Sequence, residues 1–133
     1  MSKNRKLIIS LMLSPLASCL CFAENEIVEV QKGKFIFNER KILIDAGWKP
    51  LETFEKTGNI FSKEFGSAKP IYNAGAVEVE FCSGTGVNYC HFNYSKDGQC
   101  LQILTGGEYF KENESPKIIS WSFVKCDLLS TKK

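Results

Sequence analysis

Residues 77–105 read VEVEFCSGTGVNYCHFNYSKDGQCLQILT, and this stretch decides the fold. Apolar residues alternate with glutamates over residues 77–81, which is the period of a strand with one buried face. Two glycines in residues 83–86 and the Asp-Gly pair at 97–98 favour tight turns, because glycine reaches positive φ angles without strain. The stretch therefore predicts three antiparallel strands joined by two short turns.

The same alternation divides the side chains of these strands between two faces. One predicted face is apolar and includes Phe92, Tyr94, Leu101 and Ile103. The other face is polar, and we predict that it is the binding face. Its members are Glu78, Glu80, Tyr89, His91, Asn93 and Gln102. A fourth strand is predicted at residues 119–123, where Trp121 and its apolar neighbours alternate with serines.

A short helix is predicted at residues 39–46, upstream of the sheet. Asn38 is a suitable N-cap, Gly47 is a suitable C′ residue, and Pro50 cannot continue a helix. The apolar residues at helical spacing are Ile42, Leu43 and Ala46. Two helical turns are not stable alone, so we expect them to dock on the apolar face of the sheet. The predicted fold class is α+β, with a short helix packed on a four-stranded antiparallel β-meander and two disulfides.

The strand register predicts how the four cysteines of this domain pair. If the last two strands are neighbours, their apolar residues share a face, and Cys100 and Cys126 both fall on the opposite face. The prediction is a Cys100–Cys126 disulfide and, by elimination, a Cys82–Cys90 disulfide. Regular alternation would place Cys82 and Cys90 on opposite faces, so a bulge or an irregular turn in residues 84–86 is expected.

Residues 1–23 have the features of a secretory signal peptide, and residues 24–133 would form a single small domain. Basic residues precede an apolar run that is too short to span a bilayer, and small residues precede a cut after Ala23. An alternative is lipid attachment at Cys19, because residues 16–19 resemble a bacterial lipobox. Cysteine parity favours the first interpretation, since a cut before Cys19 leaves Cys21 without a partner. We expect a periplasmic or secreted protein, with a lipid anchor at Cys19 as the alternative.

The charge balance argues against binding to nucleic acid. The chain has 17 basic and 15 acidic residues, and the cut removes three of the basic ones. The remaining domain is nearly neutral and has neither a basic patch nor another long apolar run. We therefore expect no nucleic-acid partner and no transmembrane span in the mature chain. Residues 51–76 are predicted to form a long loop, which either binds a partner or is packed by its own aromatic residues.

Two motifs carry a resemblance to a known group of proteins. The first is R-x-x-L-x-x-x-G-W-x-P at residues 40–50, and the second is C-S-G-T-G at residues 82–86 followed by Cys90. Together they resemble a pattern in small secreted bacterial proteins of uncharacterised function, over about half of the mature chain. The resemblance implies a fold but no activity. In outline, a short helix on a four-stranded sheet is also similar to β-lactamase-inhibitor-like modules, which is a likeness of architecture alone.

Few residues suggest catalysis. His91 is the only histidine and is predicted to lie near Glu80, and a His–Glu pair can transfer protons, although a surface pair is commoner. Glu78 and Glu80 could form a glycosidase pair, but alternating glutamates are also ordinary on an exposed strand. Residues 83–86 lead into a strand, so they predict a turn and not a phosphate loop. No C-x-x-C spacing occurs, and we expect no metal site, no cofactor and no catalytic residue.

These observations favour a small exported binding protein and not an enzyme. We expect it to act by protein–protein contact, as an inhibitor or immunity-type protein does, on another protein of the cell envelope or outside the cell. The alternatives are an envelope lipoprotein anchored at Cys19 and a small envelope hydrolase that uses Glu80 and His91.

Overall fold

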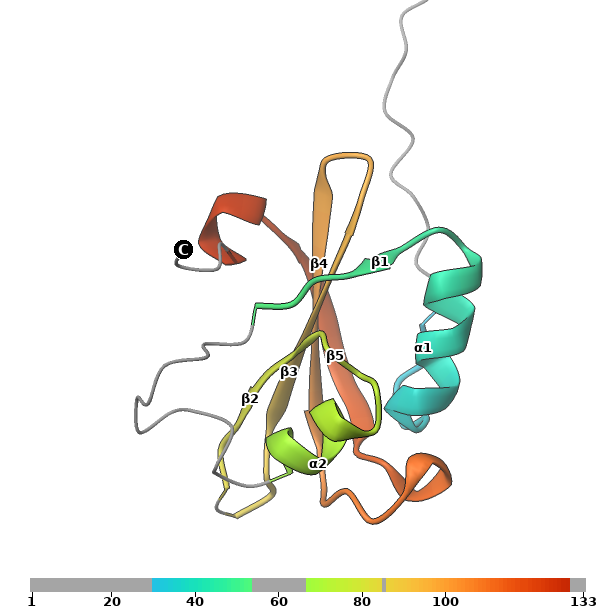
Figure 1. Ribbon diagram of the computed structural model, residues 1–133, viewed down its shortest axis with the longest axis vertical. Coiled ribbons are helices and arrows are strands. Elements are labelled where there is room, and N and C mark those ends of the chain that lie inside the picture. Colours follow the sequence, from blue (N-terminus) through green and yellow to red (C-terminus); the bar gives the residue numbers. More distant parts are fainter. Residues whose placement is uncertain (1–29, 54–66, 85, 130–133) are drawn as a thin grey trace, which may run out of the picture.

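The three strands predicted from the alternation pair in sequence order within an antiparallel sheet in the computed structural model, which describes residues 30–53, 67–84 and 86–129. The strands are β1 (Lys49–Pro50), β2 (Val79–Cys82), β3 (Cys90–Lys96), β4 (Gln99–Gly106) and β5 (Lys117–Val124). The helices are α1 (Ile36–Asp45) and α2 (Ala68–Asn73), with 3-10 turns η1 (Glu112–Glu114) and η2 (Cys126–Leu129) (Figure 1). The α+β class is confirmed. The predicted signal peptide and Cys19 lie outside the described residues.

The pairing of β4 with β5 confirms the face assignment of the last two strands. Leu101 lies opposite Phe123, and Ile103 lies opposite Trp121. On the other side, β4 pairs with β3 in a continuous register from Cys90–Thr105 to Lys96–Gln99. Side chains of Phe92, Tyr94, Leu101 and Ile103 are fully buried in a single core on one face of the sheet.

Two short segments pair with the same edge of β3. β2 covers its N-terminal half, and β1 covers its C-terminal half, where Lys49 lies opposite Ser95 and Pro50 opposite Tyr94. The sequence predicted Pro50 only as the end of a helix. A proline at the outer edge of a sheet is tolerated because its missing N–H costs no ladder hydrogen bond, so β1 makes this a five-stranded sheet.

Helix α1 begins three residues earlier than predicted, because another part of the chain caps it. Ile36 donates its backbone N–H to Pro116 O at 2.9 Å, and Phe37 donates its own to Ser115 Oγ at 3.3 Å. These contacts satisfy N–H groups that have no partner within the helix. Asn38 therefore lies inside α1 and not at its N-cap.

The buried side of α1 also differs from the predicted one. Ile36, Phe37 and Leu43 enter the core, whereas Ala46 is exposed and Ile42 is 43 % exposed. Of the three predicted docking residues, only Leu43 was right. Ile36 and Leu43 are two helical turns apart and thus share one face.

The predicted C-terminal end of α1 is confirmed. Gly47 has a φ of +94°, its N–H bonds to Ile44 O, and the N–H of Trp48 bonds to Leu43 O. This is a Schellman motif, in which glycine takes the left-handed position without a Cβ penalty. Trp48 is buried behind the turn, with its ring centroid 6.1 Å from that of Phe123.

Helix α2 lies in the stretch predicted as a loop. Its buried residues Ala68 and Ile71 belong to the same core as α1, so both helices pack on the apolar face of the sheet. Pro70 lies in the first turn, where a missing N–H is harmless, and Gly75 follows the helix with a φ of +100°. These two residues were a usable signal for a short helix.

Both predicted disulfides, Cys82–Cys90 and Cys100–Cys126, are present. The irregularity that the first one needs lies within β2 and not at residues 84–86. Val79 pairs with Phe92 and Cys82 with Cys90, so three steps along β2 match two steps along β3. This bulge brings Cys82 to the same face as Cys90.

Candidate functional site

Glu78 does not belong to the predicted binding face. β2 begins at Val79, and Glu78 lies in the turn before it, so the alternation does not extend to this residue. Its fully buried carboxylate faces α1, where Arg40 Nε lies 2.6 Å from Oε1 and Arg40 Nη2 lies 3.4 Å from Oε2. The hydroxyl of Tyr94 donates to Oε1 at 2.7 Å. Arg40, Glu78 and Tyr94 thus form a buried polar triad that joins α1 to the sheet.

The triad changes the chemistry of Tyr94. Burial raises the pKa of its hydroxyl well above the usual value near 10, and the negative charge and hydrogen bond of Glu78 raise that pKa further. Arg40 acts in the opposite direction. Tyr94 is therefore a neutral hydrogen-bond donor, and its role is structural.

On the opposite face of the sheet, Glu80 and Asn93 are engaged in an internal network. Asn93 Nδ2 donates to Glu80 Oε2 at 2.9 Å and to Thr53 Oγ1 at 2.7 Å, and Asn93 is fully buried. Gln102 Nε2 donates to Asn93 Oδ1 at 3.0 Å. The segment that follows β1, residues 51–53, thus reaches this part of the predicted face through Thr53, so these polar groups hold the fold together.

The two catalytic pairs considered from the sequence are not assembled. The His91 ring packs at 5.3 Å from the Phe81 ring, while the Glu80 carboxylate accepts from Asn93 and Gln102. Within the described ranges, no hydrogen bond or ion pair joins Glu80 to His91. Glu78 and Glu80 lie on opposite faces, so they cannot flank one glycosidic bond.

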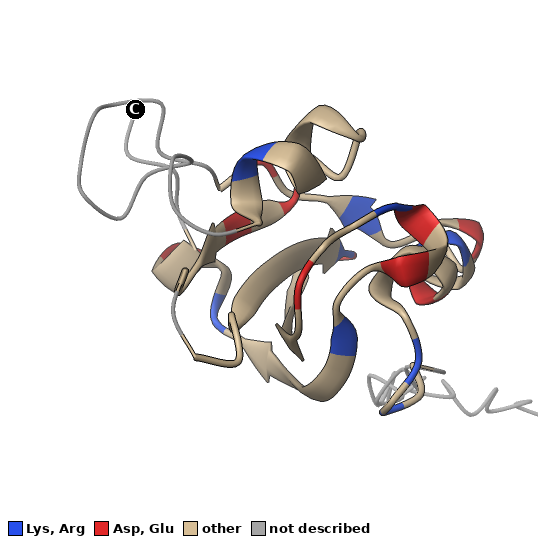
Figure 2. Ribbon diagram, turned by 90° about the horizontal axis from the view of Figure 1, so that it is seen from below, with Lys and Arg blue, Asp and Glu red and all other residues tan. Residues whose placement is uncertain are grey.

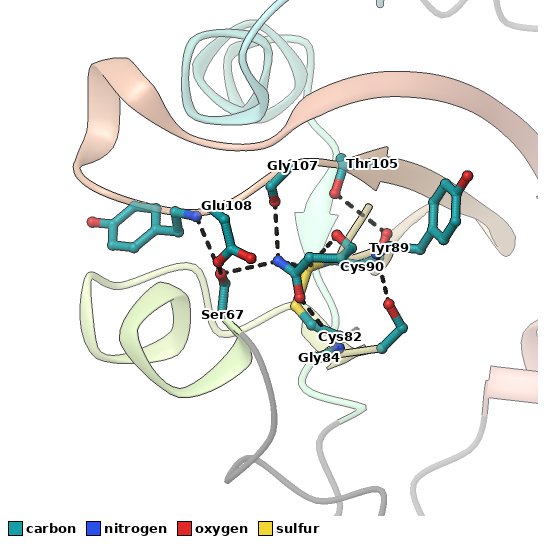
Figure 3. The surroundings of a disulfide bond; sticks show 11 residues. Ser67, Cys82, Gly84, Tyr89, Cys90, Thr105, Gly107 and Glu108 are labelled. Atoms are coloured by element: carbon teal, nitrogen blue, oxygen red, sulfur yellow. Dashed lines mark hydrogen bonds between the residues drawn. A yellow bond between two sulfur atoms is a disulfide. The ribbon is translucent and has the colours of Figure 1, made fainter. Parts of the chain in front are cut away.

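The turn between β2 and β3 is held by Asn88, which the sequence analysis did not single out. Asn88 is buried in the left-handed conformation, with a φ of +55°. Its Nδ2 donates to Ser67 Oγ and to Gly107 O, each at 3.0 Å, and its Oδ1 accepts from Gly84 N at 3.3 Å (Figure 3). An Asn in a Gly-rich turn was the available signal, because Asn tolerates this conformation best after glycine.

Ser67 extends this network to the loop after β4. Its hydroxyl accepts from Tyr109 N at 3.1 Å and donates to Glu108 Oε2 at 3.2 Å (Figure 3). The start of α2, the turn before β3 and the loop after β4 are therefore tied together beside the Cys82–Cys90 disulfide. Hydrogen bonds that are buried or part-buried fix all three segments, so we expect this end of the sheet to be rigid.

Exposed apolar side chains gather at this end of the sheet. A Cβ added at Gly106 would lie 2.8 Å from Ile119 Cδ1 and 2.9 Å from Val87 Cγ1, so both side chains meet over the glycine. Both are exposed, as is Tyr89, whose ring points away from the disulfide (Figure 3). Tyr89 directly precedes β3, and half-buried His91 follows it by two residues. We call Val87, Tyr89, His91 and Ile119 the turn-end patch.

A shallow hollow of about 380 Å³ opens at the other end of this face. Its walls include Leu51, Thr53, Leu129 and the Cys100–Cys126 disulfide. Glu52 and Ser95 also line it, but Glu52 is exposed, so the hollow holds no buried charge that would fix a small ligand.

Charged residues of both signs are spread over the described part of the chain. Lys and Arg are interspersed with Asp and Glu along the ribbon (Figure 2). Among residues 30–53, 67–84 and 86–129, no three His, Cys, Asp or Glu side chains are grouped to hold a metal ion. The helices in these ranges are too short and too polar to cross a membrane.

Comparisons with protein-family models, with curated proteins and with solved structures found no match to this chain.

Proposed function

We propose that this chain is a small exported binding protein that acts by protein–protein contact through the turn-end patch. The observation that carries the proposal is that exposed Val87 and Ile119 meet over Gly106 at the hydrogen-bonded end of the sheet, with exposed Tyr89 two residues after Val87. Exposed apolar side chains that cluster on a fixed scaffold are typical of protein interfaces, and tyrosine is enriched there. A rigid patch also loses little conformational entropy on binding.

Three further features support this proposal over the alternatives. Two disulfides are typical of an oxidising compartment, which fits the signal-peptide features of residues 1–23. Glu80 is engaged by Asn93 and Gln102, which disfavours an envelope hydrolase. We propose that it acts as an inhibitor or immunity protein does, by occupying a site on another protein without chemistry of its own.

The test compares two isoleucines of similar exposure. Ile119 in the turn-end patch is 40 % exposed, and Ile42 on α1, which covers the other face, is 43 % exposed. The oxidised protein and its Ile119→Ala, Tyr89→Ala and Ile42→Ala variants are used to capture partners from an envelope extract, and each affinity is then measured with the purified partner. We expect Ile42→Ala to bind the partner as the wild type does. Ile119→Ala should bind more weakly than Ile42→Ala, and Tyr89→Ala should bind about tenfold or more weakly than the wild type, as for an interface anchor. Failure to capture any partner, or equal binding by all variants, contradicts the proposal.

A further inference from the structure

Among the described residues, only a short segment pairs with the outer edge of β5. Residues 33–35 pair with its first two residues, since Gly33 N donates to Ile118 O at 2.8 Å and Ile118 N donates to Lys34 O at 2.9 Å. Beyond Ile118, none of the described segments pairs with this edge. A strand edge of this kind presents unpaired N–H and C=O groups to any extended chain.

The register shows which backbone groups of β5 point outward. Peptide groups of successive residues in an antiparallel strand point alternately to either side. The backbone N–H and C=O of Ile118 both point away from β4. Those of Thr105, which lies opposite Ile118, therefore point towards β3. The preceding residue, Leu104, therefore directs its backbone N–H and C=O towards β5, where its partner is Ser120.

From Ser120 onward the pairing is regular, so the alternation can be followed to the end of the strand. Ser120 and Ser122 direct their backbone groups to β4, and Trp121 and Phe123 direct theirs outward. The Phe123 side chain is exposed as well. The open edge thus offers two consecutive sets of hydrogen-bonding groups together with apolar contact area.

The charges along β5 indicate what could pair there. Residues 118–124 contain no charged side chain, although edge strands are commonly protected by a lysine in their middle. Exposed lysines stand instead at the two ends, Lys117 and Lys125. If a second copy paired in antiparallel fashion about Trp121, Lys117 of one copy would face Lys125 of the other, and like charges opposite each other are unfavourable.

We propose that the edge of β5 accepts an extended segment of the partner protein, with an uncharged, β-prone middle and acidic residues on both sides. The segment would add a strand next to β5, with main-chain hydrogen bonds to Trp121 and Phe123 and acidic side chains near Lys117 and Lys125. This inference rests on the proposed function and specifies the class of protein segment that would bind. Ile119 belongs both to β5 and to the turn-end patch, so one partner can contact the patch and the edge together.

The test uses synthetic peptides and the isotope-labelled, oxidised protein. One peptide has an alternating threonine–valine core flanked by paired glutamates, and the control has the same core flanked by paired lysines. We expect the glutamate peptide to shift the backbone amide NMR signals of Trp121 and Phe123 and to bind about tenfold more tightly than the lysine peptide, with the difference reduced by salt. No shift, or equal affinity for both peptides, overturns the proposal.

A pair of variants separates the backbone from the side chain. Phe123→Ala removes the ring and keeps the outward N–H, whereas Phe123→Pro removes both and leaves the hydrogen bonds to β4 in place. We expect Phe123→Pro to bind the glutamate peptide about tenfold more weakly than Phe123→Ala, at matched urea midpoints. Equal binding overturns the proposal, as does a dimer that Phe123→Pro disrupts.

The outcomes also distinguish this inference from the proposed function. If a captured protein partner is lost by Tyr89→Ala but binds Phe123→Pro and Phe123→Ala equally, the function stands and the edge is not used. If no protein partner is captured, the peptides still report on the edge.

Discussion

Removal of the Arg40 charge is expected to destabilise the fold more than most surface changes would. The variant Arg40→Met keeps the aliphatic stem and deletes the guanidinium. In the wild type, Arg40 Nε lies 2.6 Å from Glu78 Oε1, and Arg40 Nη2 donates to Gly75 O at 3.0 Å. Without these contacts, the fully buried Glu78 carboxylate keeps Tyr94 as its donor but has no neutralising charge.

The magnitude follows from the burial of the two partners. Loss of one partner of a buried ion pair costs about 3–5 kcal/mol, because the remaining charge is desolvated and uncompensated. The Arg40 side chain is 21 % exposed, so water can partly replace it, and we expect about 3 kcal/mol. For a domain near 100 residues this corresponds to a fall of about 12 °C in Tm.

The assay is equilibrium unfolding in urea, followed by tryptophan fluorescence and circular dichroism, with free-thiol titration to verify that both disulfides remain oxidised. Lys41→Met is the matched control, since it removes an exposed cation from the next position of α1. The triple variant Arg40→Met/Glu78→Leu/Tyr94→Phe removes all three polar partners, and we expect it to be no less stable than Arg40→Met alone. A loss below about 1 kcal/mol for Arg40→Met, or losses that simply add in the triple variant, would refute this account of the triad.

Three other changes have defined outcomes. Tyr94→Phe is expected to lower the free energy of unfolding by about 1.5–3 kcal/mol at neutral pH, because it removes a hydrogen bond to a charged acceptor. Since the pKa of Tyr94 is raised in the folded state, the stability of the wild type should also fall as the pH rises above about 10. The urea midpoint of the variant should depend less on pH in that range. Gly106→Ala places a methyl group 2.8 Å from Ile119 Cδ1 and 2.9 Å from Val87 Cγ1, and both exposed side chains can rotate away, so the loss in urea unfolding should stay near 1 kcal/mol while partner affinity falls. A loss of about 3 kcal/mol, as in an overpacked core, would mean that the patch is packed rather than exposed. Replacement of Cys100 and Cys126 by serine opens a ring with a sequence separation of 26 and should cost about 3.5 kcal/mol, and an unchanged urea midpoint would show that this disulfide does not constrain the unfolded chain.

The sequence was sufficient wherever the signal is local. Alternation over a strand, the Asp-Gly turn and the glycine that ends α1 each depend on the backbone preferences of a few neighbouring residues. The Cys100–Cys126 pairing could also be predicted, because strand register follows from the requirement that apolar residues share one face. The turn-end patch was foreseen only through Tyr89 and His91, since exposed Val87 and Ile119 meet there through Gly106.

Contacts between distant parts of the chain decided the rest. In the sequence Glu78 continues the alternating pattern, but in the structure it lies in the turn before β2, and its buried carboxylate bonds to Arg40, 38 positions away. The start of α1 depends on Ser115, 78 positions from its partner, and so no local capping residue could reveal it. Local sequence fixes the backbone preferences of each segment, whereas the partner of a buried charge or a free N–H depends on which surfaces the folded chain brings together.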